Sequence, residues 1–232
     1  MLAVVPARGG SKSVPGKNLR TVGGLSLVAR AARVTGELSW LDGAVLSTDD
    51  PMIAEEGLRH GLSVPALRPA ELATDTALSI DVWRHAWLEA ERVNGMHYDV
   101  SILLEPTSPM REPADVVATL DAMIDGGHAS AATVSRTPGH CTPHKTLTIG
   151  DEGVLAFYLS EGARYSLRQS IPKYYHRNGI CYAARRETVV DAGLIIEKGC
   201  RAVVVDRPVV NVDEEIDLRF AEFLLAGMGS PR

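Results

Sequence analysis

The sequence predicts an α/β fold with a mainly parallel mixed sheet, helices on both faces and a small inserted β arm. Short apolar runs alternate with longer amphipathic stretches, which is the βαβ pattern of a mainly parallel sheet. The chain has 232 residues, 45% of them hydrophobic, enough for one sizeable core. Between residues 138 and 177 the alternation gives way to Pro, Gly, His and Tyr, which indicates an insertion.

The N-terminal half shows the alternation clearly. Residues 2–6, LAVVP, predict a buried strand that ends at a Gly-rich loop. Helical spacing of apolar residues predicts a helix over residues 25–35, and a second apolar strand follows over 43–47. Further helices are expected over residues 51–60 and 78–93. Because the strands are apolar throughout, helices should cover both faces of the sheet.

The next part of the chain repeats the pattern and then interrupts it. A strand over residues 100–104, a helix over 113–124 and a strand over 129–134 are expected in that order. The insertion that follows carries two short β-prone pieces, at residues 146–149 and 154–158. We expect them to form a small arm or lid.

Regular alternation resumes after the insertion. An apolar strand is expected over residues 179–183, a short helix from Glu187 and a strand over 202–205. Amphipathic spacing predicts a terminal helix over residues 214–225. No internal repeat divides the chain, so residues 1–232 are expected to form a single domain with an inserted arm.

Charge is distributed unevenly. The net charge is −5, yet residues 1–36 carry six Lys or Arg residues and no acidic residue. The remaining residues hold 18 basic and 29 acidic side chains, which argues against the extended basic surface of a nonspecific nucleic-acid binder. A locally basic segment favours a pocket for a small anion.

Cysteine usage and hydropathy bear on the compartment. Cys141, Cys181 and Cys200 are widely spaced, so neither a disulfide framework nor a four-cysteine zinc site is expected. His140 and His144 lie beside Cys141, but without a second ligand pair we expect a polar loop there. No apolar run approaches the ~20 residues that span a bilayer, and the apolar start is too short for a signal peptide. A soluble cytoplasmic protein is expected.

The loop after the first strand, ARGGSKSVPGKN, is the first candidate site. It places Arg8, Lys12 and Lys17 beside glycines, which let backbone amides turn toward bound oxygens. The spacing matches neither G-x-x-x-x-G-K-[ST] nor G-x-G-x-x-G, which disfavours a generic ATPase or dehydrogenase. A phosphate-binding loop is predicted, and a turn with solvated lysines is the alternative.

Two later segments combine turn residues with polar and charged groups. Residues 103–111, LLEPTSPMR, end a strand with Glu105, two hydroxyls and an arginine, and prolines fix such a turn. Residues 168–182, RQSIPKYYHRNGICY, combine tyrosines with arginines, which grip carboxylates bidentately. A carboxylate-bearing ligand is favoured, with ordinary turn chemistry and a solvated or dimer-forming basic arm as alternatives.

Acidic residues gather in the segment VVNVDEEIDL, residues 209–218. Carboxylates in the first turn of a helix complement its dipole, so capping is the alternative role for Glu214, Glu215 and Asp217. Asp213 fits either a cap or a ligand-binding role.

Together these segments resemble the acylneuraminate cytidylyltransferase (CMP-sialic acid synthetase) family in its short bacterial form. The first loop resembles the family's signature loop, and the tyrosine-rich segment matches the pattern R-Q-x-x-P-x-x-Y-x-x-N-G-x-x-Y at seven positions. The family usually reads Q-P-T-S-P-L-R where this chain has Glu105 in place of the glutamine. The family's Asp-x-Asp pair corresponds to Asn211 and Asp213, so one carboxylate is missing here. With shorter matches between, the resemblance covers essentially the whole chain.

The resemblance implies a Rossmann-like nucleotidyltransferase fold and an enzyme that uses CTP to activate a nine-carbon 2-keto sugar acid of the sialic, legionaminic or pseudaminic type. It implies that CTP is bound by Arg8, Lys12, Lys17, Asn18, Arg68 and Ser79. It implies that the sugar is bound by Glu105, Lys145, Arg168, Tyr182, Ile195 and Ile196. Mg²⁺ is implied at Asp213 and Asn211, and catalytic roles fall to Arg8, Lys12 and Asp213. A homodimer is implied, with the arm at residues 138–177 reaching toward the partner's site.

Two alternatives stay open. A CMP-Kdo-type or other sugar nucleotidyltransferase would change the sugar or the base, although the N-G-x-x-Y block favours the nine-carbon family. A non-catalytic nucleotide-binding homologue would have lost turnover through the changes at Glu105 and Asn211. No side chain is marked as the general base. We further hypothesise that Glu105 favours a sugar with an amine or a different set of hydroxyls, such as legionaminic or pseudaminic acid.

Overall fold

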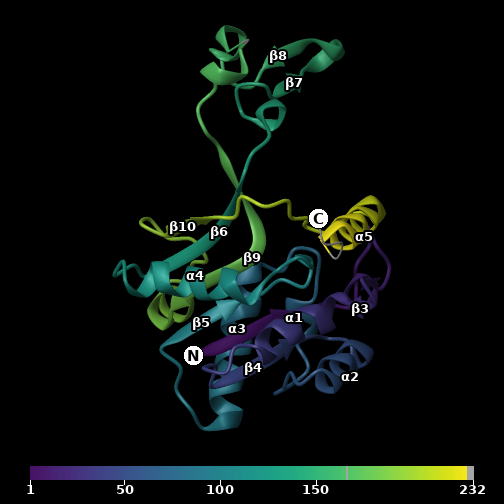
Figure 1. Ribbon diagram of the computed structural model, residues 1–232, viewed down its shortest axis with the longest axis vertical. Coiled ribbons are helices and arrows are strands. Elements are labelled where there is room, and N and C mark those ends of the chain that lie inside the picture. The colour runs from purple at the N-terminus through teal and green to yellow at the C-terminus, as the bar shows by residue number, and fades with distance from the viewer. Residues whose placement is uncertain (166, 229–232) are drawn as a thin grey trace.

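The computed structural model describes residues 1–165 and 167–228 and shows an α/β architecture (Figure 1). A six-stranded sheet has the strand order β10-β6-β9-β5-β1-β4. Its strands are β1 (Leu2–Pro6), β4 (Gly43–Ser47), β5 (Val100–Leu103), β6 (Ser130–Arg136), β9 (Tyr175–Arg185) and β10 (Arg201–Val204). β9 runs antiparallel to its neighbours β5 and β6, and the other pairs are parallel. The prediction of a mainly parallel mixed sheet is confirmed.

Side chains of β1 alternate between the two faces of the sheet, and helices cover both. The α-helices are α1 (Leu27–Gly36), α2 (Pro51–Arg59), α3 (Ser79–Asn94), α4 (Pro113–Ile124) and α5 (Glu215–Met228). Ala3 and Val5 belong to an apolar cluster with residues of α1, α2 and α4. Leu2 and Val4 belong to a second cluster, with two buried tryptophans of α3. Because successive side chains of a strand face opposite sides, both faces are buried.

Side chains cap the N-termini of the helices α1 and α2. Ser26 precedes α1, and its hydroxyl accepts a hydrogen bond from the backbone N–H of Ala29. Asp50 precedes α2, and its carboxylate accepts from the backbone N–H groups of Met52 and Ile53. Such caps satisfy amides of the first turn that lack an intrahelical partner. They also fix where each loop ends.

A short hairpin replaces the first turn of the helix expected over residues 25–35. Strands β2 (Thr21–Val22) and β3 (Leu25–Ser26) pair antiparallel, and the helix begins after them. Gly23 and Gly24 form the turn with φ values of 58° and 78°. Positive φ at both central residues defines the turn that suits a two-residue hairpin, and Gly-Gly is one of its sequence signals. The sequence therefore does carry the signal for this hairpin.

Strand β9 is longer than expected. It begins at Tyr175 rather than near residue 179, and Tyr175 pairs with Arg136 at the end of β6. The first residues of β9 therefore lie inside the stretch expected to be irregular. After β9, the π-helix η7 (Glu187–Asp191) takes the place of the short helix expected from residue 187.

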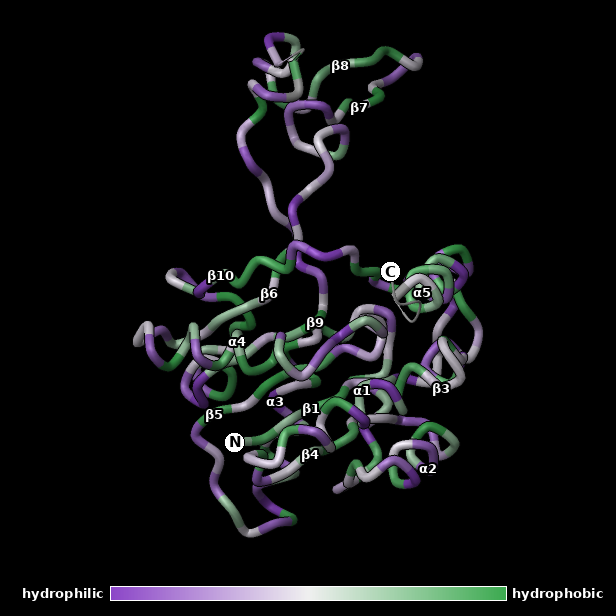
Figure 2. Tube along the Cα trace, viewed as in Figure 1, coloured by the Kyte–Doolittle hydropathy of each residue, from purple (hydrophilic) through white to green (hydrophobic). Residues whose placement is uncertain are grey.

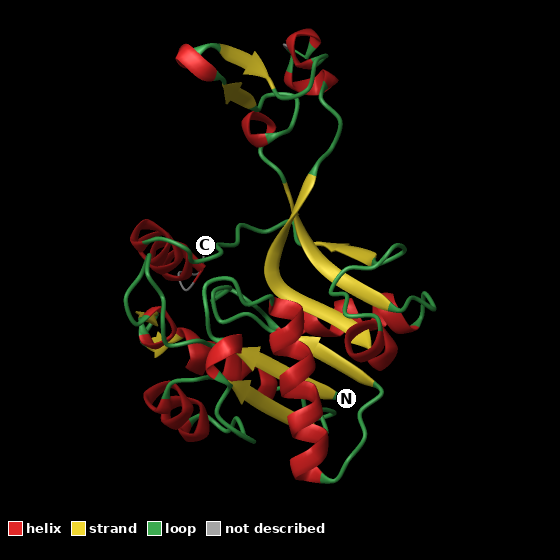
Figure 3. Cartoon of the chain, turned by 180° about the vertical axis from the view of Figure 1, so that it is seen from behind, coloured by secondary structure: helices red, strands yellow, loops and turns green. Residues whose placement is uncertain are grey.

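Between β6 and β9 the chain leaves the main body as a projecting arm, residues 137–174 (Figure 1). Figure 3 shows the two long strands crossing as they lead into it. Within the arm, β7 (Leu147–Ile149) and β8 (Leu155–Phe157) form an antiparallel hairpin at the two β-prone pieces. The buried ring of His144 lies 4.0 Å from that of Tyr165, between centroids. The arm's other elements are the short helices η3 (Gly139–Cys141), η4 (Asp151–Gly153), η5 (Gly162–Arg164) and η6 (Arg168–Ser170).

Candidate active site

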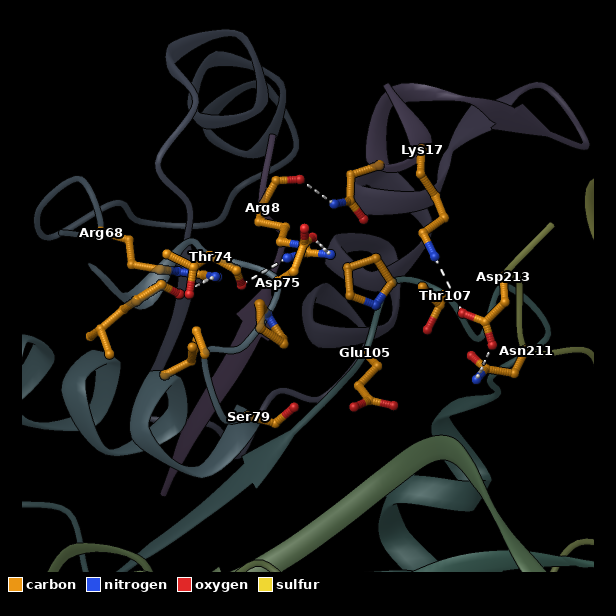
Figure 4. A pocket seen from close by; sticks show the side chains of 16 residues that line it. Arg8, Lys17, Arg68, Thr74, Asp75, Ser79, Glu105, Thr107, Asn211 and Asp213 are labelled. Atoms are coloured by element: carbon orange, nitrogen blue, oxygen red, sulfur yellow. Dashed lines mark hydrogen bonds and ion pairs between the residues drawn. The ribbon is translucent and has the colours of Figure 1, made fainter. Parts of the chain in front are cut away.

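A cavity of about 330 Å³ lies at the carboxyl ends of β1 and β5 (Figure 4). In the sheet, β1 has β4 on one side and β5 on the other, and ligands of open α/β sheets bind where the strand order reverses in this way. The walls come from the loop after β1, the segment between α2 and α3, the turn after β5 and the segment before α5. The polar lining includes Arg8, Lys17, Asn18, Arg68, Thr74, Asp75, Ser79, Glu105, Thr107, Asn211 and Asp213.

Contacts of Asn18 and Gly9 hold the loop after β1 in shape. Asn18 is buried, and its side-chain amide donates to the carbonyl of Arg8 at 2.9 Å. The N–H of Gly9 donates to Asp49 Oδ1 at 3.0 Å. A Cβ at Gly9 would come within 2.9 Å of the Cβ of Asp50, so a larger residue would collide with the cap of α2. The loop is therefore fixed from both sides.

The cations of this loop face different partners. Arg8 lines the cavity, where its guanidinium donates to the carbonyl of Thr74 at 2.8 Å and pairs with Asp75 at 3.0 Å. The Lys12 ammonium also pairs with Asp75, at 2.5 Å, and its side chain is 84% exposed at the rim. Lys17 Nζ donates to the carbonyl of Val212 at 2.9 Å. Arg8 and Lys17 thus face the cavity, whereas Lys12 is held outside it by Asp75.

Arg68 is buried and bonded to protein groups. Its guanidinium donates from Nε to Ser47 Oγ at 3.0 Å and also reaches the Ser47 carbonyl. Burial lowers the pKa of Arg68 to about 10, with the charge of Asp49 opposing the shift, so the group stays cationic at neutral pH. Arg68 therefore ties the segment before the short helix η2 (Ala70–Leu72) to the end of β4. Ser79, at the start of α3, is exposed in the cavity wall.

A second cavity of about 220 Å³ adjoins the first. It is lined by Ser79, Glu105, Arg177, Gly179, Tyr182, Ile195 and Asn211. Ser79, Glu105 and Asn211 line both cavities. Glu105 therefore lies at the junction of the two cavities.

The Glu105 carboxylate faces this junction without a protein partner. Among the described residues, neither of its side-chain oxygens takes part in a hydrogen bond or ion pair. Burial raises the pKa of the Glu105 carboxyl above its usual range, against the opposing charges of Arg111 and Arg177. An ionised oxygen that is desolvated and unpaired favours a ligand that donates a hydrogen bond.

Arg111 positions the backbone of Glu105 through a hydrogen bond. Arg111 is not among the site residues that the sequence predicts. Its guanidinium is buried and donates to the carbonyls of Glu105 at 2.6 Å, of Gly179 at 3.0 Å and of Ile180. Burial lowers the pKa of Arg111 to about 10. The turn after β5 is thereby joined to β9, which carries Tyr182, so Glu105 and Tyr182 are held in one wall. An arginine closing the P-T-S-P turn was the available signal.

Acidic residues before α5 divide into caps and a cavity-facing group. The Asp217 carboxylate accepts from the backbone N–H groups of Asp213 and Glu214 at 2.9 and 2.8 Å, so the capping role holds for Asp217. Glu215 pairs with Arg20 on the surface. Asp213 lines the larger cavity beside Asn211, whose amide donates to Asp213 Oδ2 at 3.4 Å.

These two residues offer a carboxylate and an amide carbonyl, both of which are oxygen donors that Mg²⁺ accepts. No group of three or more His, Cys, Asp and Glu side chains in residues 1–165 and 167–228 is arranged to hold a metal by itself. Mg²⁺ typically takes one or two protein carboxylates and completes its shell with water and substrate phosphates. The donor set fits an ion shared with a bound nucleotide.

The remaining residues implied on the sugar side are spread over the molecule. Ile195 lines the smaller cavity, whereas Ile196 is 43% exposed and is not among the described lining residues. Lys145 lies in the arm, before β7, and Arg168 lies in η6 of the same arm; the Arg168 side chain is outside the described part of the structure. The arm projects away from the main body of its own chain (Figure 1), and no described residue of the arm lines either cavity.

Comparison with known proteins gives the family. A family profile described as "Cytidylyltransferase" matches residues 2–190. The chain belongs to this family. It is therefore a CTP-dependent cytidylyltransferase, and its relatives include acylneuraminate, legionaminic acid and pseudaminic acid enzymes that align over its full length.

Named relatives of this cytidylyltransferase come from several bacteria. It is 29% identical to the post-translational flagellin modification protein B of Campylobacter coli, over 97% of this chain and 94% of that protein. It is 28% identical to the CMP-N,N'-diacetyllegionaminic acid synthase of Legionella pneumophila, over 97% and 96%. It is 26% identical to a pseudaminic acid cytidylyltransferase of Campylobacter jejuni, over 96% and 95%.

Solved structures show the same nucleotidyltransferase fold. A CMP:2-keto-3-deoxy-manno-octonic acid synthetase complexed with CTP matches the cytidylyltransferase with a TM-score of 0.70 at 20% identity, covering 98% of each chain. The 4-diphosphocytidyl-2C-methyl-D-erythritol synthase of Anaerococcus prevotii matches with a TM-score of 0.61 at 11% identity, covering 97% of this chain and 98% of that one.

None of the helices in the described part of the chain is both long and apolar enough to cross a membrane.

Proposed function

We propose that this cytidylyltransferase activates a nine-carbon 2-keto sugar acid with CTP, giving the CMP-sugar and pyrophosphate. The supporting observation is the pair of adjoining cavities that share Glu105, one lined by Arg8, Lys17 and Arg68 and the other by Arg177, Tyr182 and Ile195. A nucleotide and a sugar acid would meet at that junction. Relatives over the full length are named for legionaminic and pseudaminic acids.

In the larger cavity, the nucleotide would be held by the first loop and its neighbours. Arg8 and Lys17 face the cavity and would contact the triphosphate, and Asn18 keeps the loop in shape. Lys12 would join them by leaving the rim. Arg68 and Ser79, on the opposite wall, would border the cytidine.

The reaction would join the two ligands in line. The anomeric hydroxyl of the sugar attacks the α-phosphorus of CTP and releases its proton to solvent as the new oxygen–phosphorus bond forms. The bond to pyrophosphate breaks with its electron pair on the leaving group. Rate in such phosphoryl transfers comes mainly from positioning and from neutralising charge. Arg8 and Lys12 would neutralise the phosphate charge that develops as pyrophosphate leaves.

Asp213 and Asn211 would hold Mg²⁺ together with phosphate oxygens of CTP. When bound there, the ion supplies charge neutralisation to the phosphates. With a single carboxylate, the pair should bind Mg²⁺ more weakly than two carboxylates would.

On the sugar side, Glu105, Tyr182 and Ile195 line the smaller cavity. Ile195 and its neighbour Ile196 would provide an apolar wall for an N-acyl group. Glu105 would accept a hydrogen bond from a sugar hydroxyl or amine. Because a site built around a buried acceptor rejects ligands that lack the donor, this residue should set which sugar acid is preferred, and a legionaminic or pseudaminic acid is proposed.

Lys145 and Arg168 would reach a sugar through the arm of a second copy, because the arm projects from the main body and none of its described residues lines either cavity. Exposed apolar side chains on the arm include Ile149, Val154 and Leu155. Figure 2 shows hydrophobic residues along β7 and β8. Exposed apolar surface of this kind marks protein interfaces. A homodimer in a reducing cytoplasm is proposed, and light scattering tests it by a mass of twice 24.9 kDa.

Pyrophosphate release tests the proposed reaction. The purified chain is mixed with CTP, Mg²⁺ and one of four acids: N-acetylneuraminic, legionaminic, pseudaminic or Kdo. UTP and GTP replace CTP as controls. Turnover with CTP and a nine-carbon acid is expected, and it should stop when EDTA is added. Turnover with Kdo alone contradicts the proposed sugar class. Binding of CTP without turnover by any acid points to a non-catalytic homologue.

A further inference from the structure

We propose that Asp75 competes with phosphate oxygens for Arg8 and Lys12, so that CTP or pyrophosphate binds by displacing the Asp75 carboxylate from both cations. The inference rests on the proposed function, which places these two side chains at the triphosphate. It adds a residue that limits how tightly the phosphates are held.

Asp75 grips both cations at once. Its Oδ1 lies 3.0 Å from Arg8 Nη2, and its Oδ2 lies 2.5 Å from Lys12 Nζ. The carbonyl of the preceding residue, Thr74, accepts from Arg8 Nη1 at 2.8 Å. Two oxygens on one atom that pair with an arginine and a lysine resemble the way a phosphate group is bound. The carboxylate therefore uses the same two donors that oxygens of a phosphate would use.

The contact also decides where Lys12 points. Asp75 lines the larger cavity, and in Figure 4 its carboxylate lies beside the Arg8 guanidinium. Lys12 is not among the described lining residues, and its side chain extends along the rim toward Asp75. To meet a phosphate inside the cavity, the Lys12 ammonium has to exchange partners. A phosphate entering without that exchange would face a carboxylate of like charge.

The Asp75 carboxylate is ionised across the neutral range. The hydrogen bond from Lys12, with the charges of Lys12 and Arg8, holds the pKa of Asp75 below its usual range. Competition with phosphate therefore operates throughout that range. Pyrophosphate must leave after each turnover, and product release limits the rate of many enzymes. A carboxylate that pairs again with Arg8 and Lys12 speeds the release of pyrophosphate.

Calorimetry with inorganic pyrophosphate, in the presence of Mg²⁺, tests the exchange on the intact protein. Asp75→Asn should bind pyrophosphate roughly two- to tenfold more tightly than the parent, the range expected for releasing exposed ion pairs, and pyrophosphate should inhibit it at correspondingly lower concentration. Glu71→Gln removes the same charge from the same segment, outside the cavity lining, and should leave the affinity unchanged. Equal or weaker binding by Asp75→Asn overturns the proposal.

A double-mutant cycle separates partner exchange from a general charge effect. In the Lys12→Met background, Asp75→Asn should tighten pyrophosphate binding by a smaller factor than in the parent, because one of the two competed cations is gone. An undiminished factor would mean that Asp75 acts only through its overall charge, and partner exchange would be wrong.

The same set of variants keeps this proposal distinguishable from the proposed function. Lys12→Met and Arg8→Met should each weaken pyrophosphate binding. If they do not, these cations are not phosphate ligands, and the exchange falls with that assignment. If they do, and Asp75→Asn fails to tighten binding, only the exchange is wrong. Pyrophosphate binding is read without a sugar, so a wrong sugar class leaves this test unaffected.

Discussion

The Lys17 ammonium lies 3.3 Å from Asp213 Oδ1 and joins the first loop of the chain to its last segment across the larger cavity. It also donates to the carbonyl of Val212 at 2.9 Å. The Lys17 side chain is 15% exposed and the Asp213 side chain 68% exposed. The cation is therefore fixed, whereas the carboxylate keeps one side free for a ligand. The cation proposed to bind phosphate and the carboxylate proposed to bind Mg²⁺ thus lie next to each other.

Lys17→Met should weaken CTP binding by roughly 10- to 100-fold, because hydrogen bonds to charged groups contribute about 1.5–3 kcal/mol. Calorimetric titration with CTP measures the loss. Lys198→Met, which removes an exposed lysine outside both cavities, is the matched control and should bind CTP as the parent does. An unchanged affinity in Lys17→Met would remove Lys17 from the nucleotide site.

Much of the fold follows from patterns that sequence carries directly. The continuous apolar run of β1 predicts a strand buried on both faces, and the helical spacing of apolar residues in α3 predicts a helix that packs on one of them. The β2–β3 hairpin differs from the predicted helix although Gly23 and Gly24 signal a turn, because the apolar residues after them also fit helical spacing. The composition of β9 does not predict its antiparallel direction, because that direction depends on pairing with strands that are distant in the sequence.

The sequence predicts part of the cavity lining. Arg8, Lys17, Glu105 and Asp213 do line one cavity, because each follows a strand end or precedes a helix on the same edge of the sheet. The roles of Asp75 and Arg111 depend on contacts between segments far apart in the chain, which spacing alone does not show. Lys145, by contrast, lies within the inserted arm that the sequence predicts over residues 138–177.

Asn211→Asp should lower the Mg²⁺ concentration that gives half-maximal activity by roughly tenfold, because changes around a metal typically alter its affinity by 10–100-fold. A second carboxylate adds the charge that a hard divalent ion prefers. Activity is measured against Mg²⁺ concentration at saturating CTP. Glu214→Gln, which alters an exposed acid beside the pair, should leave the Mg²⁺ dependence unchanged. No shift in Asn211→Asp would place the ion elsewhere.

Glu105→Gln should change the order in which sugar acids are used. An amide can donate as well as accept, so the preference for a donor on the sugar is relaxed. The ratio of kcat/KM between legionaminic or pseudaminic acid and N-acetylneuraminic acid should fall by roughly tenfold or more, in line with sites that discriminate through a buried polar group. The KM for CTP serves as the internal control. An unchanged ranking would mean that Glu105 does not select the sugar.

The same substitution should raise stability at neutral pH. Burial raises the pKa of Glu105 in the folded protein, so the folded state binds the proton more tightly than the unfolded state does. Stability contributed by this group is then present below its ordinary pKa and is lost as pH rises through the folded pKa. The melting temperature of Glu105→Gln should exceed that of the parent at pH 7, and the difference should shrink as the pH approaches 4. A constant difference over that interval would contradict the raised pKa.

Gly179→Ala should destabilise the protein by about 1–3 kcal/mol, the cost of a strained backbone conformation. Gly179 has a φ of 70°, and a Cβ there would lie 2.5 Å from Glu105 Oε2 and 2.7 Å from Ser108 Oγ. Urea unfolding measures the change. At Gly36, an added Cβ would have no neighbouring atom within 4 Å, and φ is not positive. Gly36→Ala should therefore be neutral or slightly stabilising. Equal effects at the two positions would contradict the close packing of Glu105 against β9.

Direct competition between sugars tests the central claim, that this cytidylyltransferase activates a nine-carbon sugar acid. The chain is incubated with CTP, Mg²⁺ and an equimolar mixture of N-acetylneuraminic, legionaminic, pseudaminic and Kdo acids, and the CMP-sugars are identified by mass spectrometry. We expect a CMP-linked nine-carbon acid to dominate, with legionaminic or pseudaminic acid ahead of N-acetylneuraminic acid. Predominant CMP-Kdo, or no CMP-sugar from a folded protein that binds CTP, would contradict it.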